Sequence, residues 1–111
     1  MEAEREIIDR LRVQFMTNKI GEEYDGVISG VTGFGFFVEL DSVFVEGFVR
    51  LSSLHEDYYF FDQRAFALIG KRTRQSFRLG DRVKVKVIDV KPHRREIELH
   101  LLKKYHIFSN L

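Results

Sequence analysis

Residues Gly30–Leu51 read GVTGFGFFVELDSVFVEGFVRL, and this stretch decides the fold. Two apolar runs flank Asp41-Ser42, a pair typical of turns, so the stretch predicts two strands, Phe34–Leu40 and Val43–Leu51. The stretch is rich in phenylalanine and glycine. A small barrel core does not readily absorb this much aromatic surface, and the surplus indicates a candidate binding face.

Three further strands are predicted on either side of this stretch. Glu22–Thr32 precedes it and contains two glycines, which favour a bend or a bulge. Arg82–Val90 has the clearest alternation in the chain, and Glu96–Leu102 alternates with Ile97 and Leu99 inward. Five short strands with a longer insert between the third and the fourth predict an all-β fold, a five-stranded antiparallel Greek-key barrel of the OB type.

The segments outside these strands carry weaker signals. Glu2–Met16 has apolar residues at helical spacing, which predicts a helix. It has no N-cap residue, which suggests that it was cut from a longer chain, and its apolar stripe needs a partner in the barrel, a second copy or another domain. Asp57–Gly70 is aromatic without a clear period. We divide the chain into residues 1–20, 21–102 and 103–111, the last without a predicted structure.

Composition narrows the class of protein. The chain has 111 residues, enough for one domain with its own core. It has no cysteine, which excludes disulfides and thiolate metal sites. The N-terminal sequence is charged from its second residue and is not a signal peptide, and no apolar run approaches the ~20 residues of a membrane-spanning helix. We therefore expect a cytoplasmic protein.

Charge is unevenly distributed although the net charge is only +1. Residues 1–70 carry 6 basic and 13 acidic side chains, whereas residues 71–111 carry 12 basic and 4 acidic ones. This asymmetry favours a basic face that meets a polyanion. The alternative is that folding interleaves the two sets of charges and leaves no patch.

Alternation along Phe34–Leu40 divides the aromatic side chains into two roles. Phe36 is predicted to point into the core, whereas Phe37 points outward. Phe34 has the parity of the core, but the glycines on both sides of it permit a bulge that turns it outward. This face of an OB barrel binds oligonucleotides, and exposed rings there stack on bases for ~1–3 kcal/mol each. The alternative is that all these rings belong to the core.

Basic residues near this face are candidate contacts to nucleic-acid phosphates. Arg50 ends the third strand beside the two rings and can stack on a base or pair with a phosphate. The loop after the fourth strand borders the same face. The candidates there and on the preceding strand are Lys91, His93, Arg94, Arg95, Lys84 and Lys86. The alternative for the loop is a solvated turn, and for the strand lysines a role in solubility.

The insert and the acidic residues give weaker indications of function. Its basic residues can reach RNA or pair with the acidic first half, and its aromatic run Tyr58–Phe61 is predicted to fold the insert onto the barrel. The acidic side chains are scattered, the histidines lack ligand spacing, and there is no phosphate-binding loop or nucleophile motif. We therefore predict no catalytic centre, metal or cofactor in this chain.

The chain resembles the S1 RNA-binding domain. The resemblance covers about residues 21–101 and rests on Tyr24–Ile28, Val31–Val38, Glu46–Ser52 and Leu79–Val83. The family pattern implies that Phe34 and Phe37 are the stacking aromatics. Many S1 domains have His at the position of Arg50, and many have Asp in the loop where this chain has His93, with Arg95 near the usual basic position. Both departures should favour phosphate contact.

The insert, Asp57–Asp62 with Leu68–Thr73, is similar to the C-terminal S1 domain of the bacterial ribonuclease R family. That resemblance implies a parent enzyme that is a hydrolytic 3′→5′ exoribonuclease, with a Mg²⁺-dependent catalytic domain preceding the S1 domain. The segment before residue 17 then resembles the helix that ends the catalytic domain.

We therefore expect a monomeric domain that binds single-stranded RNA and grips substrate for a catalytic domain in the same chain. Two alternatives stay open. The domain could be the S1 module of a translation or transcription protein, or its aromatic residues could form a protein interface.

Overall fold

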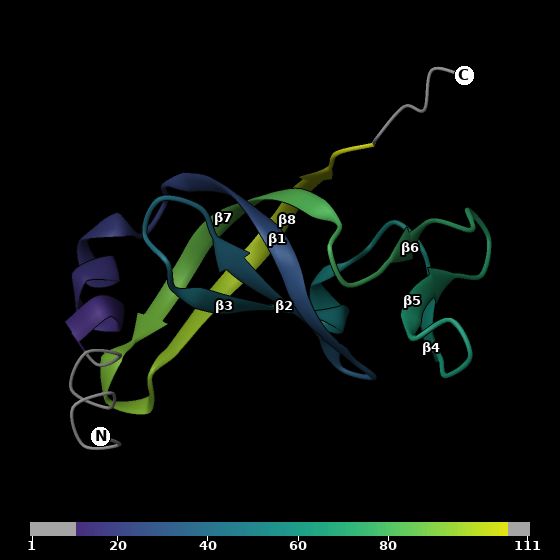
Figure 1. Ribbon diagram of the computed structural model, residues 1–111, viewed down its shortest axis with the longest axis horizontal. Helices are drawn as coiled ribbons and strands as arrows, with labels where there is room; N and C mark the ends of the chain where they lie inside the picture. Colours follow the sequence, from purple (N-terminus) through teal and green to yellow (C-terminus); the bar gives the residue numbers. More distant parts are fainter. Residues whose placement is uncertain (1–10, 107–111) are drawn as a thin grey trace.

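The computed structural model describes residues 11–106 (Figure 1). Residues 11–15 are helical, and the chain then forms three short 3₁₀ segments and eight strands. In order, these elements are η1 (Met16–Lys19), β1 (Glu23–Thr32), β2 (Gly35–Leu40), β3 (Glu46–Arg50), η2 (Leu51–Ser53), β4 (Tyr59–Asp62), β5 (Ala67–Gly70), β6 (Ser76–Phe77), β7 (Arg82–Lys91), η3 (Pro92–Arg94) and β8 (Glu96–Lys104). Within the described range, no helical segment has the length and apolar character that a bilayer crossing requires.

Five strands close a barrel in the order β1-β2-β3-β8-β7. Four of the strand pairs are antiparallel, and β3 pairs with β8 in parallel. The long β7–β8 hairpin crosses behind the β1–β2–β3 meander in Figure 1. This arrangement confirms the predicted OB-type barrel, with the parallel β3–β8 pair as the seam that closes it.

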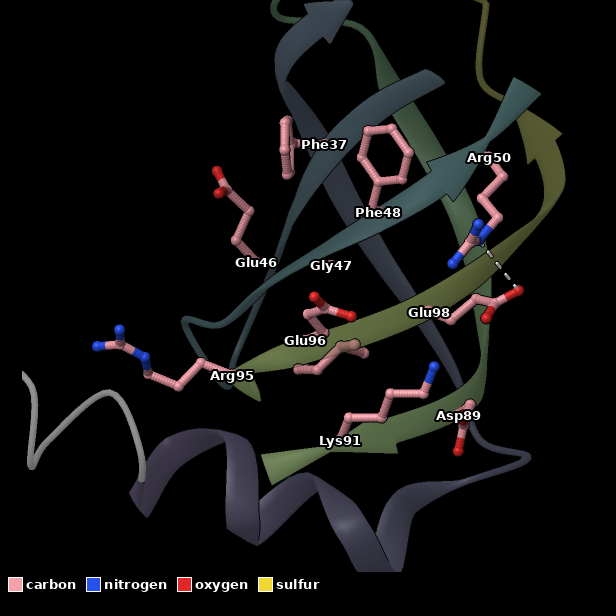
Figure 2. A pocket seen from close by; sticks show the side chains of 11 residues that line it. Phe37, Glu46, Gly47, Phe48, Arg50, Asp89, Lys91, Arg95, Glu96 and Glu98 are labelled. Carbon is pink, nitrogen blue, oxygen red and sulfur yellow. Dashed lines mark ion pairs between the residues drawn. The ribbon is translucent and has the colours of Figure 1, made fainter. Parts of the chain in front are cut away.

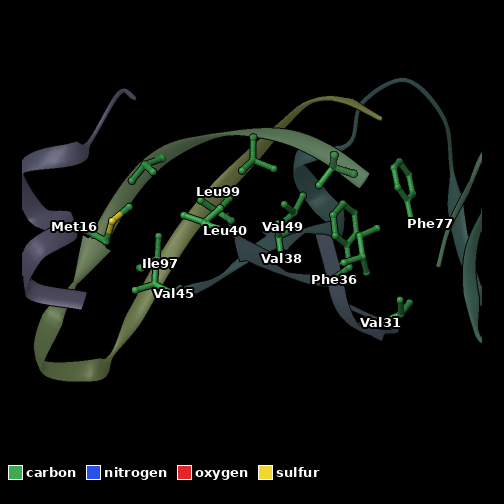
Figure 3. Packing of buried hydrophobic residues seen from close by; sticks show 14 of the residues in the cluster. Met16, Val31, Phe36, Val38, Leu40, Val45, Val49, Phe77, Ile97 and Leu99 are labelled. Carbon is green, nitrogen blue, oxygen red and sulfur yellow. The ribbon is translucent and has the colours of Figure 1, made fainter. Parts of the chain in front are cut away.

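The core follows the predicted alternation. Phe36, Val38 and Leu40 of β2 are buried, as are Ile97 and Leu99 of β8. In Figure 3, the core runs the length of the barrel between two side chains from outside it. These are Met16 of η1 and Phe77 of β6, both fully buried.

The first strand contains the irregularity that its glycines predict. Its register with β2 shifts between Ile28 and Gly30, so the pairing continues on the far side of a bulge. Ile28 and Val31 both point inward as a result, although strict alternation would place them on opposite faces. The bulge therefore keeps both ends of this ten-residue strand on the core.

The described part of the N-terminal helix packs differently from the prediction. Of the predicted stripe, Ile7 and Ile8 lie outside the described residues, and Leu11 and Phe15 are exposed. Val13 and Met16 are instead buried against the barrel. The helix also ends at residue 15, where the chain tightens into η1. The barrel is thus not the partner of the stripe that Leu11 and Phe15 form.

The insert forms its own three-stranded sheet, β4-β5-β6, which the irregular sequence pattern did not predict. Phe77 joins it to the barrel by stacking on Phe36, with ring centroids 4.9 Å apart and planes at 19°. Tyr59 contacts Phe77 from the other side at 5.4 Å. The prediction that all of Tyr58–Phe61 folds the insert onto the barrel is wrong for Tyr58 and Phe60, which are 83% and 36% exposed, whereas Tyr59 and Phe61 pack against the core.

Two strand boundaries differ from the prediction by more than one residue. The third strand begins at Glu46 rather than Val43, because the chain turns through left-handed conformations at Ser42 and Phe44, with φ of 53° and 54°. A hydrogen bond from the Leu40 amide to the Val45 carbonyl, 2.8 Å long, closes this loop. The last strand runs on to Lys104, two residues beyond the prediction.

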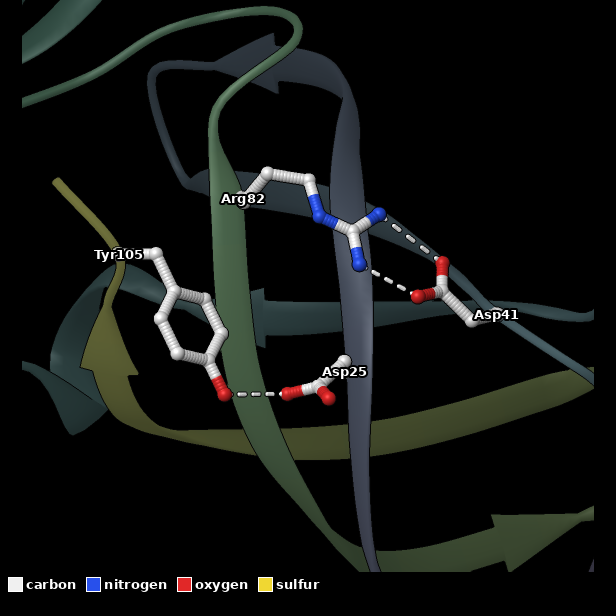
Figure 4. Close-up of polar contacts among 4 residues, drawn as sticks. All are labelled: Asp25, Asp41, Arg82 and Tyr105. Carbon is white, nitrogen blue, oxygen red and sulfur yellow. Dashed lines mark hydrogen bonds and ion pairs between the residues drawn. The ribbon is translucent and has the colours of Figure 1, made fainter. Parts of the chain in front are cut away.

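Polar contacts on the barrel surface join the acidic and basic parts of the chain (Figure 4). The Arg82 guanidinium donates two hydrogen bonds to the Asp41 carboxylate, and these bonds lower the pKa of Asp41. Lys84 lies 3.5 Å from Glu23 in a second ion pair. Folding therefore interleaves these charges, as the alternative interpretation of the charge pattern proposed.

Candidate nucleic-acid interface

Two rings lie side by side on the outer face of the β2–β3 pair (Figure 2). Phe37 and Phe48 are directly opposed in the antiparallel register, and their centroids are 4.7 Å apart with planes at 58°. Phe37 is 37% exposed, so one side of its ring remains accessible. Its outward direction confirms the prediction from alternation, and Phe48 extends the same apolar surface onto β3.

Phe34 is the most exposed ring of this region, at 82%. It lies in the turn between β1 and β2. The Phe34 amide donates a hydrogen bond of 3.0 Å to Thr32 Oγ1 within this turn. The strand starts one residue later, at Gly35, where φ is 151° and a Cβ would lie 2.1 Å from the Val49 carbonyl oxygen. Phe34 is therefore exposed as predicted, but a hairpin turn and not a bulge within the strand places it there.

Three basic side chains line the same pocket as the Phe37–Phe48 pair. Arg50 follows at the end of β3, and Lys91 and Arg95 come from the two ends of η3, between β7 and β8. All three line one pocket together with both rings, hereafter the β2–β3 pocket. The structure thus brings four of the predicted site residues together: Phe37, Arg50, Lys91 and Arg95.

Four carboxylates line the same pocket, and sequence reasoning did not place them there. They are Glu46, Asp89, Glu96 and Glu98. Glu98 lies 3.8 Å from Arg50, and Glu46 accepts a hydrogen bond of 2.6 Å from Ser29. The pocket therefore has mixed charge. Its rings provide a stacking surface that accepts any base, which the carboxylates do not provide.

The other predicted contacts lie elsewhere. His93 lines a separate hollow beside η1, with Gln14, Thr17 and Asn18. Lys84 is paired with Glu23, and Lys86 lies next to both Glu23 and His100 in the strand register. Arg94 lines none of the hollows described here. These four residues are thus not grouped with the rings.

Phe48 is the ring that sequence reasoning missed, although its signal was present. Gly47 and Val49 are buried, so period-two alternation places Phe48 and Arg50 outward together. Within residues 11–106, no group of three or more His, Asp or Glu side chains is placed to hold a metal ion.

The geometry combines stacking surfaces with nearby cations, which is a binding arrangement for single strands. The family model of the S1 RNA-binding domain matches residues 17–101. The chain belongs to the S1 RNA-binding domain family. The S1 match covers the insert sheet and all of the barrel except the last three residues of β8.

This S1 domain is homologous to the S1 region of ribonuclease R. Ribonuclease R of Buchnera aphidicola (subspecies Acyrthosiphon pisum) is 51% identical to it over 102 residues, which are 92% of this chain and 14% of that protein. Ribonuclease R of Aquifex aeolicus is 50% identical over 103 residues, 93% of this chain and 15% of that protein. The chain therefore spans only a small part of the relatives it matches.

A solved relative has the same fold. RNase R of Mycoplasma genitalium superposes on this S1 domain with a TM-score of 0.84 at 26% identity, over 91% of this chain and 16% of that one. That protein has been solved alone and in complex with ribose-methylated single-stranded RNA.

Proposed function

We propose that this domain binds single-stranded RNA by stacking bases on Phe37, Phe48 and Phe34 and by contacting phosphates with Arg50, Lys91 and Arg95. Its parent is a ribonuclease R-type 3′→5′ exoribonuclease, in which the domain grips substrate for the catalytic domain. The observation that carries this proposal is the Phe37–Phe48 pair on the barrel surface, in a pocket that three basic side chains also line.

The comparisons support the ribonuclease R parent over an S1 module of another protein. The identity of 51% extends over 102 residues, a length that takes in the aromatic insert as well as the barrel. In this proposal the domain is monomeric and cytoplasmic, and the catalytic domain alone holds Mg²⁺.

A titration with single-stranded RNA at several salt concentrations tests the binding mode. Three phosphate contacts on a single strand predict that log K falls with a slope of about −2 against log salt. A slope near zero would contradict the phosphate contacts. Because no metal takes part, removing Mg²⁺ with EDTA should leave the affinity unchanged at constant ionic strength.

Phe37→Ala tests the stacking role. We expect it to weaken RNA binding by ~1–3 kcal/mol because one stacked base is lost. The domain should remain folded, since this ring lies outside the core. Phe44→Ala is the matched control, because that ring is 67% exposed in the next loop and does not line the β2–β3 pocket. Equal RNA affinities for the two variants would contradict the stacking role of Phe37.

A further inference from the structure

A second pocket lies between the barrel and the insert, hereafter the insert pocket. The barrel contributes the Gly33–Phe34 turn and the end of β3, and the insert contributes the segments before β4 and after β5. The side chains that matter for its chemistry are Phe34, Phe48, Arg50, Tyr58, Lys71 and Arg72. None of the insert residues among them has a role in the function proposed above.

The two pockets adjoin each other, because Phe48 and Arg50 line both of them. A single strand that crosses Phe48 therefore meets Phe37 in one direction and Phe34 in the other. The surface beyond Phe34 is then the insert.

The Tyr58 ring does not pack in the core. It is 83% exposed, whereas its neighbour Tyr59 packs on Phe77. The Tyr58 backbone is nonetheless held at both ends. Its amide donates to Asp57 Oδ1 at 2.6 Å, and its carbonyl accepts a hydrogen bond of 2.9 Å from the Lys71 amide. An exposed ring on a fixed backbone is a preorganised stacking surface, because less conformational freedom is lost on binding.

The turn that carries the cations of the insert pocket is held by the same carboxylate. Asp57 accepts hydrogen bonds from the Arg72 amide, and from the amide and hydroxyl of Thr73 at 2.7 and 2.8 Å. These bonds and the one from Tyr58 hold the pKa of Asp57 at about 2. Its charge is thus engaged by the turn, and Glu56 is the other carboxylate at the pocket. Arg50, Lys71 and Arg72 line the pocket with these two acids, and the Arg72 guanidinium donates a hydrogen bond of 3.0 Å to the Glu56 backbone carbonyl.

We propose that the insert pocket is a second subsite for the same RNA strand, in which Phe34 and Tyr58 stack bases and Lys71 and Arg72 contact phosphates. This inference rests on the function proposed above, because it extends that binding path from the barrel onto the insert. The insert then lengthens the footprint of the domain as well as packing on the barrel.

The test compares RNA length with variants of the insert. Oligouridylates of about 4 and about 12 nucleotides lie at the short end and in the upper part of the range of OB-fold site sizes. For the longer RNA, Tyr58→Ala should lower the affinity about fivefold or more, whereas Tyr58→Phe, which keeps the ring, should bind like the original domain. The affinity gained between the short and the long RNA should shrink in Tyr58→Ala but not in Tyr58→Phe.

Charge provides an independent readout. Lys71→Ala should reduce the magnitude of the salt slope for the longer RNA by about 0.7, the value for one phosphate contact on a single strand. The matched controls are Arg64→Ala and Phe66→Ala, which change the insert outside this pocket and should leave both affinity and slope unchanged.

The outcomes separate the two proposals. If Phe37→Ala weakens binding while Tyr58→Ala binds the longer RNA as tightly as Phe66→Ala does, the insert subsite is wrong and the barrel site stands. If Phe37→Ala also binds normally, the proposed function fails with it.

Discussion

Arg50 Nε lies 3.8 Å from Glu98 Oε2, across the parallel strands that close the barrel. Both side chains line the pocket that holds the Phe37–Phe48 pair. The guanidinium is more than half exposed, so the pair is a surface ion pair of modest strength, ~0.2–1 kcal/mol. In the proposed complex, a phosphate competes with Glu98 for Arg50.

Glu98→Gln should therefore tighten RNA binding. The change frees Arg50 from its carboxylate partner, and the release of an exposed ion pair corresponds to about a twofold to fivefold gain in affinity. Glu96→Gln is the matched control because it removes the same charge from the same pocket without freeing Arg50. Affinities measured at low salt decide between them; a larger gain for Glu96→Gln would refute the competition.

Phe36→Ala should destabilise the domain by ~3–5 kcal/mol. The Phe36 ring is fully buried and stacks on Phe77, so its loss leaves a cavity where the insert meets the barrel. Phe34→Ala, two positions earlier, should change stability by less than about 0.5 kcal/mol but weaken RNA binding. Urea unfolding of the two variants measures this difference. Comparable losses of stability would contradict the division between core and surface rings.

That division could be predicted from the sequence because it depends on the two-residue period of one strand. Phe36 and Phe37 are neighbours, and a strand sends neighbours to opposite faces. Phe34 was predicted outward for the wrong reason, since the strand was expected to begin one residue earlier. Local pattern thus predicted the direction of all three rings, but not where the hairpin turns.

The charges around the rings could not be predicted in the same way. Glu98 meets Arg50 only because β3 pairs with β8, and no local pattern shows which distant strands become neighbours. The sheet of the insert could not be predicted from the sequence either. Its strands are short, and Tyr59 and Phe77 pack against each other across a sheet that has no regular alternation in the sequence.

Gly35→Ala should destabilise the domain by more than ~1 kcal/mol and displace the turn that presents Phe34. At a φ of 151°, a methyl group would lie 2.1 Å from the Val49 carbonyl oxygen and 2.8 Å from the Phe48 ring. Gly33→Ala is the control, since a Cβ there meets no atom within 4 Å. Thermal unfolding should separate the two variants, and a neutral Gly35→Ala would contradict the close approach of β2 and β3.

Protonation of Asp57 at low pH should destabilise the turn of the insert that contains Arg72 and Thr73. Hydrogen bonds, first of all from the Thr73 amide, lower the pKa of Asp57 from 3.8 to about 2. The ionised carboxylate therefore stabilises the fold fully above pH 3.8, and this contribution is lost as the pH falls through about 2. Amide exchange at Arg72 and Thr73, followed over this window, should accelerate more than exchange in the barrel.

Asp57→Asn provides the comparison for that experiment. It removes the titrating group, so exchange at these two amides should be faster at neutral pH and should respond less to acid. Asp41, whose pKa is also lowered, still titrates on the barrel, and for this reason the readout is confined to the insert. An unchanged acid response in the variant would show that another group controls the turn.

The parallel seam has a consequence for how the domain folds. Val49 and Leu99 are register partners although fifty positions separate them in the chain, so closing the barrel requires a long loop to be ordered. The hairpins β1–β2 and β7–β8 can form locally, but the seam cannot. Phe48 and Arg50 lie on one side of it and Glu98 on the other. In the proposed complex, an RNA strand bound across the seam stabilises the closed barrel relative to any form in which these two strands have separated.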